Sequence, residues 1–342
     1  MTDAPDWADR LEALGAAVRR HVAGLVRGGD DLRAPVAQEG GDTVYAIDRH
    51  VEPVIEREIA AWPAACLPLV LVAEGFGADG RRAFGPAGQA PKFRLLVDPI
   101  DGTRSLMYDK RAAWFLAAVA PDAGDGTRLR DAFAAAMVEL PTSKQEWCDA
   151  YTAAAGGPAR GRRCRVGGGD PRPLPPRPSA AADLRHGFGH VSNFFPGTKV
   201  LAAELMERIA AEVIGPVPPG QAVVFDDQYI CSGGQMAELV AGRDRFCCDL
   251  RPLFYDILAR RSGVAVRGLE CHPYDVAAAL VARQAGVVVT DGFGAPLDAP
   301  MDVHTGVHWC GFANAALAAR VLPVIAGWLA EHGVRPAGPT AG

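Results

Sequence analysis

The stretch "LLVDPIDGTRSL" (residues 95–106) decides how this sequence is interpreted. Its apolar run ends at Asp98, and a second carboxylate, Asp101, follows three residues later, directly before Gly102 and Thr103. Turn formation alone can account for this pattern, because Pro fixes φ, Asp caps and Gly takes positive φ. A functional interpretation rests on position. Both carboxylates would lie at the carboxyl end of a buried strand, where ligands bind in open α/β sheets.

Two neighbouring carboxylates repel each other unless a cation lies between them. Their oxygens are hard ligands that suit Mg²⁺ or Mn²⁺ rather than zinc. Gly102 and Thr103 would begin the next segment with free backbone N–H groups, which suit an anion such as phosphate. A metal beside such a helix start is typical of phosphoryl transfer. Further acids are then required, and two fit: Glu74, which ends the run "LPLVLVAE" (67–74), and Asp275, near the start of a predicted helix.

Helices and short strands are predicted along the whole chain. Helical spacing of apolar residues predicts helices over 7–26, 46–62, 197–213, 273–286 and 314–332. Short apolar runs bounded by Gly, Pro and Asp predict strands over 67–74, 92–98, 114–120, 131–140 and 286–291. The Pro- and Gly-rich segment 167–180 predicts a long loop. We therefore expect an α+β half (1–185) with Asp48, Glu74 and the 98–103 turn, and an α/β half (186–335) with Asp275 and most of the substrate pocket.

Composition narrows the class of protein. The chain has 342 residues, 49% hydrophobic and 22% charged, which is ordinary for a globular protein. Its formal net charge of −5 argues against nucleic-acid and anionic-membrane partners. The eight cysteines are scattered, as expected of reduced core thiols. The acidic, amphipathic start and the absence of an apolar run of about 20 residues predict a soluble, cytoplasmic protein.

Several segments together resemble the inositol monophosphatase family, part of the superfamily of Mg²⁺-dependent, Li⁺-sensitive phosphatases that includes fructose-1,6-bisphosphatases. "DPIDGT" (98–103) is similar to the family's central signature, and "YDVAAALVARQAGVVVTDGFG" (274–294) is similar to its second signature. "VAEG" (72–75) resembles the strand-end Glu motif, and "AIDRHVEPVIEREI" (46–59) resembles the Asp-bearing N-terminal helix. The resemblance implies a layered αβαβα sandwich.

The resemblance, which covers about residues 40–160 and 232–325, also implies an activity. The chain would be a phosphatase that hydrolyses a small phosphomonoester, inositol-phosphate-like or a sugar phosphate, with a metal-activated water. Two or three Mg²⁺ ions, or Mn²⁺, would be bound by Glu74, Asp98, Asp101, Asp275 and the backbone carbonyl of Ile100. Gly102 and Thr103 would bind the phosphate. Asp48, Glu74 and Thr103 would be catalytic, with the Thr103 hydroxyl and Asp48 helping to deprotonate the water. A homodimer is also implied.

Departures from the family pattern leave alternatives open. Where the family has a second acid after the strand-end Glu, this chain has Gly75, which motivates one alternative, a catalytically weakened member that serves as a binding or regulatory protein. Another alternative is a phosphatase for 3′-nucleotides or sugar bisphosphates on the same metal cluster. Arg104 can reach a second anionic group of a substrate or form a surface pair. Ser232 and Gly233, at the open start of a predicted helix, are weaker candidates for substrate contact. Segments 160–232 and 249–272 should shape the pocket.

Two other patterns have plainer explanations. "VVFDDQY" (223–229) also ends an apolar run in paired carboxylates, and a solvated strand end is favoured over an accessory metal site. His304 and His308, like His186 and His190, are four residues apart, as zinc ligands on a helix would be. Glycines between the members of each pair argue against those helices.

Overall fold

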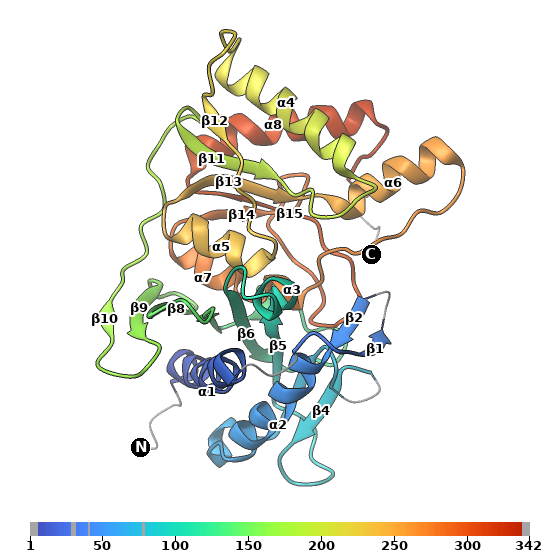
Figure 1. The fold of residues 1–342 in the computed structure, drawn as a ribbon. Coiled ribbons are helices and arrows are strands. Elements are labelled where there is room, and N and C mark those ends of the chain that lie inside the picture. The colour runs from blue at the N-terminus through green and yellow to red at the C-terminus, as the bar shows by residue number, and fades with distance from the viewer. Residues whose placement is uncertain (1–5, 29–31, 40–41, 77–78, 337–342) are drawn as a thin grey trace.

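Five layers of helices and strands build the computed structural model, which describes residues 6–28, 32–39, 42–76 and 79–336 (Figure 1). The first layer is α1 (Trp7–Gly28) and α2 (Ala46–Ala60), which cover one face of an eight-stranded sheet. On the other face lie α5 (Ser232–Val240) and α7 (Ala279–Gln284), followed by a five-stranded sheet. The fifth layer is α4 (Lys199–Ile214) and α8 (Ala315–Glu331). The predicted αβαβα sandwich is confirmed.

The eight-stranded sheet has the order β10-β9-β8-β7-β6-β5-β3-β4. Its strands are β3 (Leu69–Ala73), β4 (Arg81–Phe84), β5 (Phe93–Asp101), β6 (Ala113–Pro121), β7 (Ala134–Leu140), β8 (Trp147–Ala154), β9 (Arg160–Arg165) and β10 (Arg172–Pro173). β3 and β5 run parallel, and the other neighbouring pairs are antiparallel. All residues of β3 are buried because helices cover both faces of the sheet.

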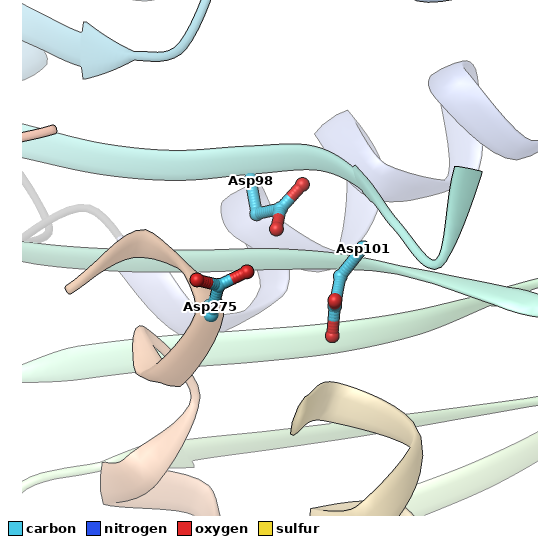
Figure 2. A group of neighbouring side chains, drawn as sticks. All are labelled: Asp98, Asp101 and Asp275. Atoms are coloured by element: carbon cyan, nitrogen blue, oxygen red, sulfur yellow. The ribbon is translucent and has the colours of Figure 1, made fainter. Parts of the chain in front are cut away.

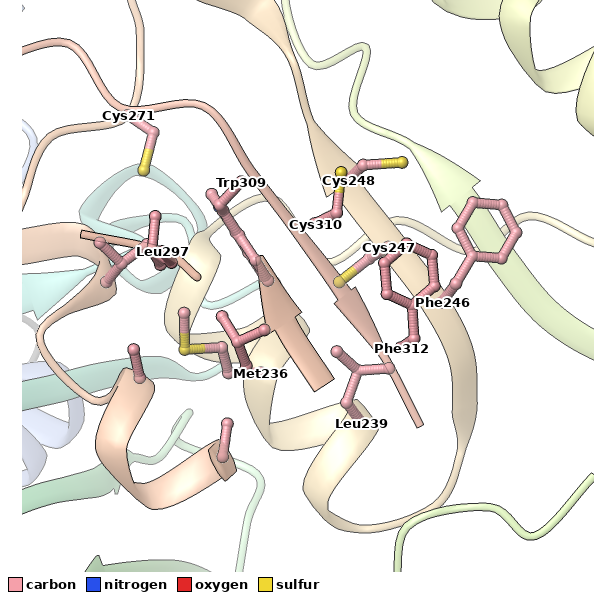
Figure 3. Close-up of a cluster of buried hydrophobic side chains, with 14 of the residues drawn as sticks. Met236, Leu239, Phe246, Cys247, Cys248, Cys271, Leu297, Trp309, Cys310 and Phe312 are labelled. Carbon is pink, nitrogen blue, oxygen red and sulfur yellow. The ribbon is translucent and has the colours of Figure 1, made fainter. Parts of the chain in front are cut away.

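The five-stranded sheet has the order β12-β11-β13-β15-β14. Its strands are β11 (Gly187–Val191), β12 (Val224–Phe225), β13 (Asp244–Asp249), β14 (Val288–Thr290) and β15 (Trp309–Phe312). Apolar side chains pack on both faces of this sheet, and they include Met236 and Leu239 of α5, Phe246 of β13 and Phe312 of β15 (Figure 3). All eight cysteines are free and seven are buried, as expected of core thiols.

Shorter elements complete the described chain. They are β1 (Pro35–Glu39), β2 (Asp42–Tyr45), α3 (Thr103–Met107), α6 (Arg251–Ser262) and the 3₁₀ turns η1 (Ala64–Cys66), η2 (Leu129–Asp131) and η3 (Tyr274–Val276). β1 and β2 pair in an antiparallel two-stranded sheet. Among the helices of the described residues, none combines the length and the apolar character needed to span a membrane.

Most predicted elements are confirmed, with shifts at their ends. The strand expected over 131–140 begins only at Ala134, because η2 precedes it. The loop expected over 167–180 contains β10, a two-residue strand at the sheet edge, where Pro is tolerated. The single helix expected over 273–286 is wrong: Ala278, with φ −79° and ψ 8°, separates η3 from α7. The altered ψ angle at Ala278 does not change the spacing of apolar residues in the sequence, so the helical periodicity of 273–286 does not reveal the break.

Candidate functional site

A β-bulge in β5 turns two carboxylates to the same side of the sheet. Asp98 pairs with Leu116 of β6, and Asp101 pairs with Trp114, so three steps on β5 match two steps on β6. In a regular strand, residues three apart point to opposite faces. The extra residue restores Asp101 to the face of Asp98, while Ile100 packs into the core on the α1–α2 side.

Three carboxylates meet at this point (Figure 2). Asp98 and Asp101 come from β5, and Asp275 comes from η3 in the third layer. One oxygen from each lies within 4.8 Å of the others. Asp98 and Asp101 are 7% and 6% exposed. Asp275 remains 19% exposed at the side chain. The structure therefore brings together residues that are far apart in the sequence.

The three carboxyl groups have raised pKa values. Burial raises the pKa of Asp98 well above its ordinary range, and the charges of Asp101, Asp275 and Glu74 raise it further. Burial also raises the pKa of Asp101 to about 7, although hydrogen bonds from Gly233 and other groups oppose the rise. Burial also raises the pKa of Asp275 well above its ordinary range, and the charge of Asp101 raises it further. Like charges held this close favour protonation unless a cation compensates them.

The start of α5 supports Asp101. The Gly233 N–H donates to Oδ2 of Asp101 at 2.5 Å, and the Cys231 thiol also hydrogen-bonds this carboxylate. A Cβ atom on Gly233 would lie 2.8 Å from the same oxygen and 2.7 Å from the Leu116 side chain, so only glycine fits. Ser232 lines the adjoining cavity. Substrate contact by Ser232 and Gly233 stays a prediction. The hydrogen bond from Gly233 to Asp101 is not predicted from the sequence.

The turn after β5 positions Thr103. Gly102 has φ +101°, a left-handed conformation that favours glycine, and it precedes the first residue of α3. The Thr103 hydroxyl oxygen lies 2.8 Å from the Ile100 carbonyl oxygen and 3.1 Å from Oδ1 of Asp48. Asp48 is itself fixed, because its Oδ2 accepts the N–H of Tyr45 at 2.9 Å. The structure thus brings Thr103 and Asp48 into contact, and these are the two residues that the resemblance expects to act together on the water.

A cavity of about 950 Å³ opens above these groups. Among the residues that line it are Asp48, Glu52, Glu74, Asp98, Asp101, Gly102, Thr103, Arg104, Ser232 and Asp275. Glu74 is exposed at the end of β3 and lies outside the group of three carboxylates, although its charge acts on Asp98. Glu52 was not among the predicted residues. Its position four residues after Asp48 on a helix would have indicated that it lies on the same face.

Residues of the segment 249–272 line one part of the cavity. Arg251, at the start of α6, forms a buried two-pronged ion pair with Asp249, with Nη2 and Oδ2 2.6 Å apart. Its Nη1 donates to the Leu269 carbonyl at 3.0 Å. The guanidinium carbon lies 5.2 Å from the ring centroid of Phe194 and 5.6 Å from that of Phe195. Sequence analysis missed this pair because no local pattern marks it.

Arg104 lies on the same side of the cavity. Its guanidinium carbon is 6.0 Å from the ring centroid of Tyr45 and 5.9 Å from that of Phe195. These distances fit cation–π contacts, which hold the charged group at the cavity surface.

Other candidate ligands from the sequence lie elsewhere. Asp226 and Asp227 are exposed beyond β12, and Asp227 pairs with Arg111 at 2.9 Å. In the part of the chain that the structure describes, neither these acids nor the two histidine pairs belong to a group suited to a metal. His308 accepts the N–H of Gly292 at 2.9 Å. The solvated strand end favoured for 223–229 is confirmed.

The residues present fit a hard divalent cation. Two buried carboxylates and a third at the cavity surface offer oxygen ligands, and a cation between them would offset both their burial and their mutual repulsion. Among the described residues the group that meets within 4.8 Å consists of carboxylates, and the Cys231 thiol contacts it as a hydrogen-bond donor to Asp101. Oxygen ligands without thiolate favour Mg²⁺ or Mn²⁺ over zinc.

Comparison with known proteins shows which solved structures share this fold. No protein-family model matches the sequence, and no curated protein matches it either. Solved structures do match: the chain has the layered fold of the inositol monophosphatase and fructose-1,6-bisphosphatase structures.

Three of these structures illustrate the similarity. The extragenic suppressor protein SuhB from Bartonella henselae is 17% identical with a TM-score of 0.62, over 94% of this chain and 98% of that one. The IMPase from Thermotoga maritima is 18% identical with a TM-score of 0.60, over 95% and 100%. The fructose-1,6-bisphosphatase from Leishmania major is 13% identical with a TM-score of 0.64, over 92% and 93%.

Proposed function

We propose that the chain is a metal-dependent phosphatase that hydrolyses a small phosphomonoester. One observation carries this proposal: the carboxylates of Asp98, Asp101 and Asp275 meet within 4.8 Å, directly before the turn at Gly102 and Thr103. Solved structures with the same fold include enzymes described as an inositol monophosphatase and a fructose-1,6-bisphosphatase, which supports the assignment.

Five groups would hold the cation. They are the carboxylates of Glu74, Asp98, Asp101 and Asp275 and the carbonyl oxygen of Ile100. Two or three Mg²⁺ ions are expected, and Mn²⁺ is an alternative. When bound, such an ion lowers the pKa of water and neutralises charge that develops on the leaving oxygen.

The chain itself would bind the phosphate and move one proton. The N–H groups of Gly102 and Thr103 are at the start of α3, where backbone donors have no partner inside the helix, and they suit phosphate oxygens. The Thr103 hydroxyl would accept a proton from the attacking water as its own proton passes to Oδ1 of Asp48. The water oxygen bonds to phosphorus, the ester P–O bond breaks, and an alcohol and inorganic phosphate leave.

A panel of phosphate esters tests the proposal. Wild-type protein is assayed with Mg²⁺ on inositol, sugar and nucleotide phosphates, alongside Asp98→Asn. We expect phosphate release from at least one ester by wild type and a loss of at least about a hundredfold in the variant. Unchanged release by Asp98→Asn would contradict the assigned cluster. Absence of turnover together with tight ester binding would favour the binding or regulatory alternative.

A second candidate is a phosphatase for an ester with a second anionic group, such as a sugar bisphosphate or a 3′-nucleotide. The observation that favours it is the presence of two arginines, Arg104 and Arg267, among the residues that line the cavity. The same panel separates the two candidates, because a bisphosphate should then have the lower KM.

Three further expectations stay predictions. They are a homodimer, a cytoplasmic location and the division of the chain at about residue 185. Sedimentation at several concentrations would test the first, and separate expression of the two halves would test the last.

A further inference from the structure

Glu52 lines the same cavity as the acid cluster but comes from another element, α2. It lies on α2, one helical turn after Asp48, and both side chains line the cavity. Residues four apart share a face of a helix. The face that bonds Thr103 through Asp48 therefore also directs Glu52 toward the site.

The main chain after β3 makes room for this carboxylate. Gly75 follows Glu74 directly and has φ +81°, a left-handed conformation that favours glycine. A Cβ atom on Gly75 would lie 3.3 Å from Oε1 of Glu52, closer than a carbon–oxygen contact normally allows. The Glu52 carboxylate thus lies against the backbone beside Glu74, where a residue with a side chain would displace it.

Glu52 also pairs with an arginine on its own helix. Arg49 Nη1 is 3.4 Å from Oε1 of Glu52, and the side chains are 47% and 22% exposed, respectively. A pair this exposed on one helix contributes little to holding the carboxylate in place. Glu56, one turn further along α2, pairs instead with Arg82 at 2.9 Å and is not among the residues that line the cavity.

We propose that Glu52 is an additional carboxylate of the cation site, acting beside Glu74 on the open side of the cluster. This inference rests on the proposed function. Asp98 and Asp101 supply oxygens from the buried side and Asp275 supplies one at the cavity surface, and Mg²⁺ usually keeps several waters that need hydrogen-bond acceptors. Glu52 accepts those hydrogen bonds or binds the ion directly. Its carboxylate fits there because residue 75 is glycine.

Mn²⁺ titration of matched variants tests this role without using activity. Free Mn²⁺ is measured by electron paramagnetic resonance for wild type, Glu52→Gln and the control Glu56→Gln, and thermal unfolding in EDTA checks that each is folded. We expect Glu52→Gln to weaken Mn²⁺ binding about tenfold or more, as loss of a supporting ligand does. Glu56→Gln should bind as wild type does. Equal affinity of Glu52→Gln and wild type would overturn the inference.

A double-variant cycle tests the link to Gly75. Gly75→Ala should weaken Mn²⁺ binding in the wild-type background by displacing the carboxylate, and it should have a smaller effect in the Glu52→Gln background. Equal effects in both backgrounds would contradict the link, because the substitution would then act through Glu74. Wild-type protein that binds no Mn²⁺ would contradict the proposed function itself. If wild type binds Mn²⁺ and Glu52→Gln binds it equally well, only the inference about Glu52 is wrong and the proposed function is unaffected.

Discussion

The hydroxyl oxygen of Thr103 lies 3.1 Å from Oδ1 of Asp48, although 55 positions separate the two residues. The contact joins the turn after β5 to the first turn of α2. We expect Thr103→Val, which keeps the shape and removes the hydroxyl, to lower kcat about 10²- to 10⁴-fold. Thr103→Ser should retain most activity. Phosphate release at saturating ester measures both, and a Thr103→Val enzyme with normal kcat would exclude the hydroxyl from proton transfer.

Gly233 should tolerate no side chain. In Gly233→Ala the new Cβ would crowd Oδ2 of Asp101 and the side chain of Leu116, so we expect unfolding free energy to fall by about 1–3 kcal/mol. Mn²⁺ affinity should fall as well, because Asp101 must move. The matched control is Gly327→Ala in α8, where a Cβ meets nothing within 4 Å and stability should rise by about 0.5–1 kcal/mol. Urea unfolding in EDTA measures both, and equal stability of the two variants would refute the crowding argument.

Stabilisation by Mg²⁺ should depend on pH. The folded-state pKa of Asp101 is raised to about 7 from an ordinary 3.8, so between about pH 4 and 7 the folded, metal-free chain keeps a proton that the unfolded chain releases. Relative to Asp101→Asn, wild type in EDTA should therefore lose stability as pH rises, by up to about 1.4 kcal/mol per pH unit.

Bound Mg²⁺ competes with these protons, so its stabilising effect should grow with pH up to about 7 and then level off. Thermal unfolding with EDTA and with Mg²⁺ at each pH gives the difference directly. Buried Asp244, whose pKa is also raised to about 7, cancels in that difference because it is not in the acid cluster. A Mg²⁺ effect that is constant with pH would contradict the prediction.

Removing only one partner of the buried ion pair between Asp249 and Arg251 should lower the stability of the protein. Asp249 is fully buried, so Arg251→Met leaves its charge uncompensated and should lower unfolding free energy by about 3–5 kcal/mol. The double variant Asp249→Leu with Arg251→Met should recover most of this loss. Because Arg251 also supports Leu269 and the two Phe rings at the cavity wall, KM of the double variant should change more than kcat. Urea unfolding and steady-state kinetics measure these effects, and a single variant as stable as wild type would show that the pair contributes little.

Local patterns predicted the elements that position the site. The apolar run before Asp98, the amphipathic helix with Asp48 and the strand that ends before Glu74 all appear in the fold. Strand alternation alone would have placed Asp98 and Asp101 on opposite faces. The bulge between them corrects this, and a bulge depends on pairing with β6 that the sequence of β5 does not contain.

Contacts between distant segments account for what was missed. Gly233 bonds Asp101 across 132 positions, and the Glu52 carboxylate lies against Gly75 from another element. Such contacts depend on how the layers pack against each other. The spacing of residues within one segment does not contain that information. The split of the helix expected over 273–286 is a local effect, since the backbone at Ala278 leaves helical geometry and apolar spacing does not record this.

The acid cluster joins two parts of the chain that lie in different layers of the fold. Asp98 and Asp101 belong to the eight-stranded sheet, whereas Asp275 and the Gly233 donor belong to the layer between the sheets. An ion shared by all three carboxylates would act as a removable cross-link that closes a long loop of the chain, with the entropic benefit that such closure brings. Chelation would then loosen the contact between layers as well as stop catalysis.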